Sequence, residues 1–508
     1  MATTFRTLRD VFGRSAPKME QLAADQQDFL RDAADMEGAR TDGYKIYEAA
    51  YDGERNIELT DRQQTFLEAS GVPFSENLSR TIADTHRRRL RVRGFDVEDR
   101  QDVSDWLTKD FWRRGRLAAL ANVVHGKRLI LGDAAVIVDW DRRTGRPKPF
   151  FNHPRNVKFV YGDNGDLLYV AKVWNTRRTS PQNPRGESIR RLNLYCPDRV
   201  EKWYTASNST QSLWAPYLDP DDSERGAPLW PLPWTVTGRM GAEPLGIPAV
   251  HFRLDALGDD YGRSILKPVI PLNDELEKQV LDLFEVMDQQ GWKQRWATGV
   301  QDGTDLVVAI GEFLTSSSDT TRFGAFEAEE PRPLLEIIEG TLRRVSVVSA
   351  TPLHDLLITS GTQPSGESRK DASTPLVAAT EDRWEDAGNS WEDVCRIAWR
   401  LSAAWGDGEH KAPAFDDSAV IDVQWEPAET RNDRDEVETL AIEVEMLGLS
   451  RTSALRKRGH DPDEEARLRA EEADDAPLPP PPDGPAVVPD ALRQPQPDAP
   501  VPAEPTPA

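Results

Sequence analysis

Apolar residues recur every three or four positions in three stretches of the second half of the chain, which predicts three helices. The first runs from Ile265 to Met287, and Pro268 and Pro271 are expected to restrict or kink its first turns. The third, over 369–405, would be about 55 Å long at 1.5 Å per residue, which exceeds ordinary globular helices. Between them, the second helix places four apolar residues on one face: Leu334, Ile338, Leu342 and Val345.

The first half of the chain carries strand patterns. The run from Ala134 to Trp140 is β-branched and apolar, and turn-forming residues flank it. Because helical segments precede the strands, the sequence predicts the α+β class. Further strands, with a turn at 162–165 between two of them, are expected at 157–161, 168–174, 191–196 and 200–204.

The remaining stretches have other compositions. Residues 292–329 are irregular, with a strand-capable run at 306–310. Residues 351–368 are rich in Gly, Ser, Thr and Pro, which predicts a loop. The charged stretch 433–472 suits short helices, and the proline-rich stretch 473–508 predicts a disordered or polyproline-like tail.

Charge limits the possible interactions with nucleic acid. The 508 residues include 63 Lys plus Arg and 87 Asp plus Glu, which gives a formal net charge of -24. Neutralised phosphates drive non-specific DNA affinity, so tight binding is not expected outside a local basic patch. Two basic clusters occur, at 87–93 and 451–458. Solvated faces or ion pairs between subunits explain such runs more often than DNA contacts do.

Cysteine usage and hydropathy indicate the compartment. Cys196 and Cys395 are far apart and form neither a disulfide framework nor a zinc pattern, which fits a reducing cytoplasm. No stretch approaches the roughly 20 apolar residues that a spanning helix needs. The first ten residues lack the apolar core of a signal peptide. We therefore expect a soluble protein that no signal peptide exports.

Candidate catalytic patterns are weak. The segment 361–368 has the spacing of a phosphate-binding loop, but Glu367 stands where lysine belongs and would repel phosphate. Asp139 and Asp141 share one face of a predicted strand, as in two-metal sites, yet no third carboxylate is assignable and a solvated strand end is favoured. The seven histidines show no metal-ligand spacing. We expect no enzyme activity, no cofactor and no metal.

The order of the elements resembles a known family. A helix, a small insertion, a helix, a loop and a very long helix resemble the portal proteins of tailed bacteriophages with long tails. The resemblance covers roughly residues 28–472 and leaves out the proline-rich tail. Three stretches resemble family signatures: GDAAVIVDWDRRTGRPKPFFNHPRNVKFVYGD at Gly132 to Asp163, GIPAVHFRLDALGDDYGRSIL at Gly246 to Leu266, and TPLHDLLITSGTQPSGES at Thr351 to Ser368.

The resemblance implies a portal-like subunit with several domains. It assigns an α+β wing to 1–262, a first stem helix to 263–291, a small α/β clip to 292–330, a second stem helix to 331–350 and a tunnel loop to 351–368. The long helix and its return to the wing would occupy 369–432, a helical crown 433–472 and the disordered tail 473–508.

The same resemblance assigns candidate residues along a DNA channel. The first stem helix would supply possible channel-lining residues, among which carboxylates would repel phosphate: Lys267, Asp274, Lys278, Asp282 and Glu285. The tunnel loop would reach toward the DNA, and its glycines and neutral side chains permit unusual backbone conformations and short-lived hydrogen bonds. We expect Pro352 to end the helix before the loop and Ser368 to cap the helix after it. The candidate loop residues are Thr351, His354, Ser360, Gly361, Thr362, Gln363, Ser365, Gly366 and Ser368.

The implied function is a ring of twelve subunits at the capsid vertex, through which double-stranded DNA is packaged and ejected without sequence specificity. Implied partners are other copies of the chain, the terminase large subunit, a head-completion (adaptor) protein, and the major capsid and scaffold proteins. The implied location is the virion, after assembly in the host cytoplasm, with no membrane. Two alternatives stay open: a metal-dependent phage DNA-processing enzyme, and a purely structural capsid or tail component that never meets DNA.

Overall fold

Helices dominate the start of the described chain. The computed structural model describes residues 24–36, 39–70, 75–180, 183–205, 213–218, 223–224, 227–228, 230–291, 295–298, 320–325, 331–356, 366–408 and 411–429. The first elements, in chain order, are α2 (Ala24–Ala34), α3 (Ala39–Asp52), α4 (Asp61–Ser70), α5 (Leu78–Arg87), strand β1 (Val92–Val97), α6 (Gln101–Asp105), the π-helix η2 (Trp106–Arg113) and α7 (Leu117–Leu131).

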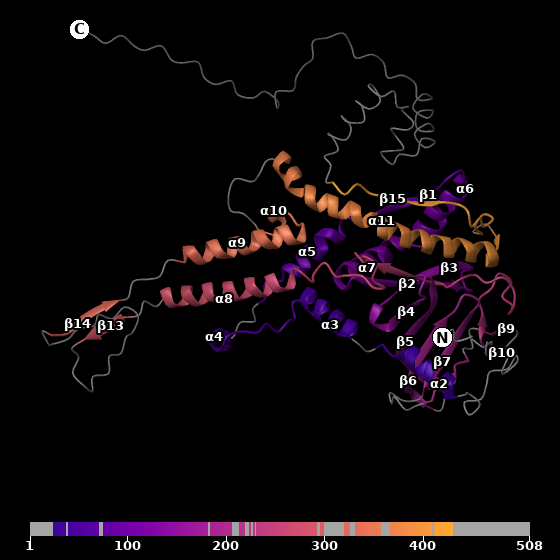
Figure 1. Ribbon diagram of the computed structural model, residues 1–508, viewed down its shortest axis with the longest axis horizontal. Coiled ribbons are helices and arrows are strands. Elements are labelled where there is room, and N and C mark those ends of the chain that lie inside the picture. The colour runs from indigo at the N-terminus through magenta and orange to yellow at the C-terminus, as the bar shows by residue number, and fades with distance from the viewer. Residues whose placement is uncertain are drawn as a thin grey trace, which may run out of the picture. The chain divides into compact units, whose positions relative to one another are not determined.

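The two largest sheets of the described chain, both antiparallel, follow α7 (Figure 1). The smaller one has the strand order β12-β2-β3 and consists of β2 (Asp133–Asp141), β3 (Arg146–Asn152) and β12 (Ala249–Arg253). Every residue from Ala134 to Val138 in its central strand is buried, so both faces of that strand are covered.

The larger sheet has the order β11-β7-β6-β5-β4, and β8 pairs with β7. Helix α2 packs on it through Leu30, which joins Tyr169, Leu192 and Trp203 in a second buried cluster. Its strands and the short elements between them are η3 (Pro154–Asn156), β4 (Val157–Tyr161), β5 (Leu167–Ser180), β6 (Asn183–Tyr195), β7 (Arg199–Thr205), β8 (Ala215–Pro216), β9 (Ser223–Glu224), β10 (Ala227–Pro228) and β11 (Leu232–Pro233).

Among the residues that the structure describes in the second half of the chain, the three longest elements are helices. Helices α8 (Ile270–Gly291) and α9 (Arg332–Ser349) lie side by side and pack through Leu276, Leu342 and Val345 (Figure 1). In sequence, the hairpin of β13 (Arg295–Thr298) and β14 (Arg322–Ala325) lies between them. The remaining elements are α10 (Leu353–Leu356), α11 (Gly366–Trp405) and β15 (Ile421–Trp425).

Helix α11 and the last strand close the body. The 40-residue helix packs against all three strands of the smaller sheet, and β15 returns to pair antiparallel with β1, so that Val97 lies opposite Ile421. None of the helices in the described ranges is long and apolar enough to cross a membrane.

The predicted α+β class and most predicted elements are confirmed. β4 has the bounds that the sequence predicts, and β2 exceeds its prediction by one residue at each end. Predicted strands at 168–174, 191–196 and 200–204 correspond to β5, β6 and β7. The stretches 306–310, 433–472 and 473–508 lie outside the described residues.

Helix boundaries near prolines and the predicted loop differ from expectation. Helix α8 begins at Ile270 rather than Ile265, because Pro268 and Pro271 are tolerated only in a first turn. Within the stretch predicted as a loop, α10 forms a short helix and α11 already begins at Gly366. Ser368 is therefore inside α11, and its predicted role as the cap of that helix is wrong.

Trp391 of α11 lies in the largest buried cluster. Its ring makes edge contacts with Trp112 of η2 and Phe252 of β12, at centroid distances of 5.1 and 5.0 Å. Its indole Nε1 donates a 2.8 Å hydrogen bond to Nε2 of His125 in α7, and Nδ1 of His125 lies 2.9 Å from the carbonyl oxygen of Leu90. A neutral ring with its proton on Nδ1 satisfies both partners, and burial lowers the pKa of His125 to about 3.

We expect Trp391→Phe to lower the free energy of unfolding by about 2–3 kcal/mol, because it opens a cavity and removes the donor to a buried histidine nitrogen. Chemical denaturation followed by far-UV circular dichroism measures the loss. Trp296→Phe is the matched control, since this ring in β13 is 38 % exposed and its replacement should cost less than about 1 kcal/mol. Equal losses in the two variants would contradict a special role for Trp391.

Candidate functional site

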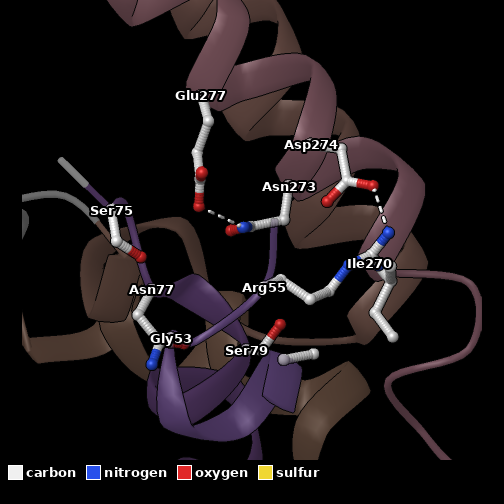
Figure 2. A pocket seen from close by; sticks show the side chains of 10 residues that line it. Gly53, Arg55, Ser75, Asn77, Ser79, Ile270, Asn273, Asp274 and Glu277 are labelled. Atoms are coloured by element: carbon white, nitrogen blue, oxygen red, sulfur yellow. Dashed lines mark hydrogen bonds and ion pairs between the residues drawn. The ribbon is translucent and has the colours of Figure 1, made fainter. Parts of the chain in front are cut away.

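The N-terminal end of α8 meets two other segments of the chain at a polar junction (Figure 2). Side chains from α8, from the residues after α3 and from the start of α5 point into one cavity of about 10 Å³. That volume holds about one water molecule, so the junction does not fit a nucleotide or metabolite. The polar lining residues are Arg55, Ser75, Asn77, Ser79, Asn273, Asp274 and Glu277.

Glu277 is the most perturbed carboxyl group at this junction. Nδ2 of Asn273 donates a 3.0 Å hydrogen bond to Oε1 of Glu277, and Oδ1 of Asn273 accepts one of 3.3 Å from the backbone N–H of Leu78 in α5. Burial raises the pKa of Glu277 to about 7, and the nearby charge of Asp274 adds to the rise. The two α8 side chains thus fasten this helix to the start of α5.

Three of the five channel-lining candidates on α8 have partners within the subunit. Asp274 forms an ion pair of 2.8 Å with Arg55. Further along α8, Glu285 lies 2.5 Å from Nε of Arg62. Oδ1 of Asp282 accepts a 2.9 Å hydrogen bond from Gln63, so α4 lies along this face of α8. The other two candidates differ: Lys267 is exposed just before α8, and Lys278 is half-buried within it.

The helix pair also exposes large apolar side chains. Met287 of α8 is 54 % exposed, and Val347 of α9 is 81 % exposed. Large apolar side chains that form an exposed patch mark protein contacts. The others on this pair are Phe284, Leu335, Ile337 and Val348.

The predicted tunnel loop begins at Thr351, just after α9. The residues around this point, which we call the foot of the loop, are held against the body of the subunit. Helix α9 ends at Ser349, and Ala350 adopts a left-handed conformation with φ of 52°. Thr351 is buried, and its carbonyl oxygen accepts a 2.7 Å hydrogen bond from Oγ of Ser346. His354 lies half-buried in α10.

The other loop candidates are divided. Gly366 and Ser368 lie at the start of α11. Thr351 and His354 therefore lie at the start of the segment 351–368, and Gly366 and Ser368 lie at its end. The remaining candidates lie outside the described residues: Ser360, Gly361, Thr362, Gln363 and Ser365.

The described basic cluster makes local contacts. Arg87 pairs with Asp84 at 3.0 Å, and Arg91 lies 3.8 Å from Glu426. Both ion pairs form within the subunit, and Arg87 is half-buried. The second cluster, at 451–458, lies outside the described residues.

Asp139 and Asp141 are matched by basic residues on the neighbouring strand. In the β2–β3 ladder Asp139 lies opposite Lys148, and Asp141 lies opposite Arg146. Asp141 also accepts a 2.9 Å hydrogen bond from the backbone N–H of Arg143, as a turn-stabilising residue does. Over the described ranges, His, Cys, Asp and Glu form no group of three or more that could hold a metal ion.

A buried network around Asp133 was not singled out by sequence reasoning. Its Oδ1 lies 2.9 Å from Nε2 of His251 and accepts a 2.8 Å hydrogen bond from the N–H of Gly262, and Oδ2 accepts one of 2.6 Å from the Tyr44 hydroxyl. Nδ1 of His251 lies 2.9 Å from the Tyr161 hydroxyl, whose pKa burial raises to about 12. These hydrogen bonds join β2, β4, β12 and α3 to the segment around Gly262. The available signal was that Asp133, Tyr161, His251 and Gly262 all lie within the signature stretches.

Comparison with known proteins identifies the family. Residues 68–477 match the family of phage portal proteins described as SPP1 Gp6-like, which is more than half of the 508-residue chain. The chain belongs to this portal protein family. The portal proteins of Mycobacterium phages D29 and L5 are each 20% identical to it, over 378 and 381 residues, and each match covers 69% of this chain and 70% of the relative.

Solved structures of similar chains come from gene transfer agent particles. The neck of the native particle, computed with C12 symmetry, is 10% identical with a TM-score of 0.38, covering 83% of this chain and 99% of that one. The neck of the empty particle, computed with C6 symmetry, is 10% identical with a TM-score of 0.40, covering 81% and 96%.

The expectation of a phage portal protein is therefore confirmed, and the two alternatives are not supported. Portal proteins are structural components of the phage particle. The matched region contains α8, α9 and α11 as well as the stretch 433–472. It begins at residue 68, later than the residue 28 that the resemblance suggested, and it ends at residue 477, close to the suggested 472.

We expect Glu277→Gln to stabilise this portal protein above about pH 7 by on the order of 2 kcal/mol, and to have little effect below about pH 4.5. A carboxyl group whose folded pKa is raised contributes stability at low pH and loses that contribution as pH rises through the folded value. Thermal unfolding between these pH values measures the difference. Glu275→Gln, at an exposed position on the same helix, is the control. A difference between Glu277→Gln and wild type that does not depend on pH would contradict the assignment.

Proposed function

We propose that this portal protein assembles into a closed ring of twelve subunits around an axial channel for double-stranded DNA. In this arrangement α8 and α9 form the stem, β13 and β14 belong to the clip, and the segment at 351–368 is the tunnel loop. Residues 1–262 and 369–432 form the wing, and 433–472 form the crown. The subunit number is the one that the family resemblance implies.

The exposed apolar surface of α8 and α9 carries this proposal. Ile337, at 51 % exposure, and Val347 belong to α9, and Met287 belongs to the adjacent α8; all three side chains would face water in an isolated subunit. Burying these side chains against a neighbouring copy is favourable at about 25 cal/mol per Å². A contact of this kind between unlike surfaces generates a ring when its rotation closes.

Charge supports passage of DNA without adhesion. The net charge of -24 per chain opposes phosphate binding. Because Arg55 and Arg62 lie against Asp274 and Glu285, the field of these two stem carboxylates is weakened. We therefore infer that the repulsion comes from the summed charge of the ring, with Lys267, Lys278 and Asp282 completing the proposed lining.

Other proposed partners follow from the portal role. They are the terminase large subunit, a head-completion (adaptor) protein, and the major capsid and scaffold proteins, with assembly in the host cytoplasm before incorporation into the virion. We also infer that the protein has no catalytic activity, cofactor or metal. The pairing of Asp139 and Asp141 with basic residues of β3 supports this inference. Nuclease or ATPase activity that survives repurification and is lost in Asp139→Ala would overturn it.

Negative-stain electron microscopy and native mass spectrometry of the purified chain test the proposed ring. We expect end-on particles with a central hole and a single closed oligomer at micromolar concentration. Monomers or dimers alone at that concentration would contradict the proposal.

We expect Gln363→Glu and Gly366→Trp to reduce DNA packaging into heads while leaving ring assembly unchanged. The first adds a charge that repels phosphate, and the second adds bulk at the end of the proposed tunnel loop. A packaging assay beside a ring-assembly assay measures both effects, and Gln363→Asn, which keeps a neutral amide, is the control. Normal packaging by the charged and bulky variants would show that another element faces the DNA.

A further inference from the structure

His86 joins the helix before the predicted loop to the helix after it. It lies in the last turn of α5 and is 1 % exposed. Its Nε2 is 2.9 Å from the carbonyl oxygen of Ser349, the last residue of α9. Its Nδ1 is 2.7 Å from Nη1 of Arg383 in α11. One imidazole ring therefore contacts both helices.

The chemistry of the two partners fixes the state of the ring. A guanidinium group can only donate hydrogen bonds and a carbonyl oxygen can only accept them. Nδ1 of His86 therefore accepts from Arg383, and Nε2 carries the proton that is donated to Ser349. Burial, and then the charge of Arg383, lowers the pKa of His86 to about 4, which keeps the ring neutral near pH 7.

The turn on the α9 side of His86 is held by its own hydrogen bonds. The N–H of Thr351 donates to the carbonyl oxygen of Ser346 at 3.1 Å, and Oγ of Ser346 donates to the carbonyl oxygen of Thr351 at 2.7 Å. Thr351 is 1 % exposed, and α10 packs against α5. These contacts hold Ser346 and Thr351 together in one turn beside His86.

Arg383 lies in the part of α11 that is anchored in the body. Residues 368–375 are mostly exposed, and Pro375 removes one backbone hydrogen bond from this end of the helix. Fully buried side chains of α11 begin at Leu376 and continue to Trp391 and beyond. The contact with His86 therefore reaches the anchored part of α11 directly and bypasses its exposed end.

We propose that His86 is a positioning residue that couples the foot of the tunnel loop to α11. Displacement of the loop foot is transmitted through Ser349, His86 and Arg383 into the long helix, and movement of α11 is transmitted back along the same bonds. This inference rests on the proposed role of 351–368 as the segment that meets DNA. The mechanical coupling itself is measurable without DNA.

Pulsed electron spin resonance tests the coupling. Spin labels at Asp355→Cys in α10 and Glu381→Cys in α11, both exposed positions, report the distance across His86 in a Cys196→Ser, Cys395→Ala background. In spin-diluted protein we expect a narrow distance distribution that broadens roughly twofold in His86→Phe, because both hydrogen bonds are lost. His86→Gln, which keeps a donor and an acceptor, should broaden it less and serves as the second variant if His86→Phe does not fold.

The matched control is His251→Phe. His251 also has a buried side chain with two hydrogen bonds, but its partners, Asp133 and Tyr161, lie outside α9 and α11. This variant should lose stability without broadening the distribution. A distribution that stays narrow in His86→Phe, or broadens equally in His251→Phe, would overturn the proposal. Failure of wild-type rings to package DNA would instead contradict the proposed function. It would not change the spin-label result, which is measured without DNA.

Discussion

The packing of α11 against the smaller sheet is the contact on which the rest of the body depends. Trp391 touches η2 and β12 and donates its indole hydrogen to His125 of α7, so one side chain joins α11 to three elements that lie far from it in the sequence. A fully buried tryptophan stabilises a fold through its large area, and its N–H must find a partner. Here that partner is a histidine that burial keeps neutral. The hydrogen bond fixes the orientation of the Trp391 ring within an otherwise apolar core.

Local elements were largely predictable from the sequence, and their partners were not. A period of two or of 3.6 residues reports which side of a strand or helix is buried, and this signal identified β2, β4, α9 and α11. The pairing of β1 with β15 leaves no such trace, because neither strand contains information about the other's position in the chain. The helical start of α11 within a Gly- and Ser-rich stretch was missed, since propensity yields to tertiary context.

The candidate site shows the same division between local and long-range information. Acidic residues on α8 were correctly placed on a helix, but the sequence could not show that Arg55, Arg62 and Gln63 lie against three of them. Likewise, the sequence spacing of the histidines argues against metal binding but does not indicate the structural roles of His86, His125 and His251. Each ring connects two separate elements with its two nitrogens. Such a role follows from three-dimensional neighbours and has no sequence spacing of its own.

The pairing of β1 with β15 sets an order on biosynthesis. Val97 is made early and its partner Ile421 is made late, so the ribosome releases α8, α9 and all of α11 before the body can close. Pairings between residues this far apart form slowly, because the intervening chain loses much conformational freedom when they meet. A chain that stops before β15 leaves β1 as an open edge. The body can therefore close only after synthesis has passed Trp425, and a chain cut short before that residue presents an open strand to its neighbours instead of a closed body.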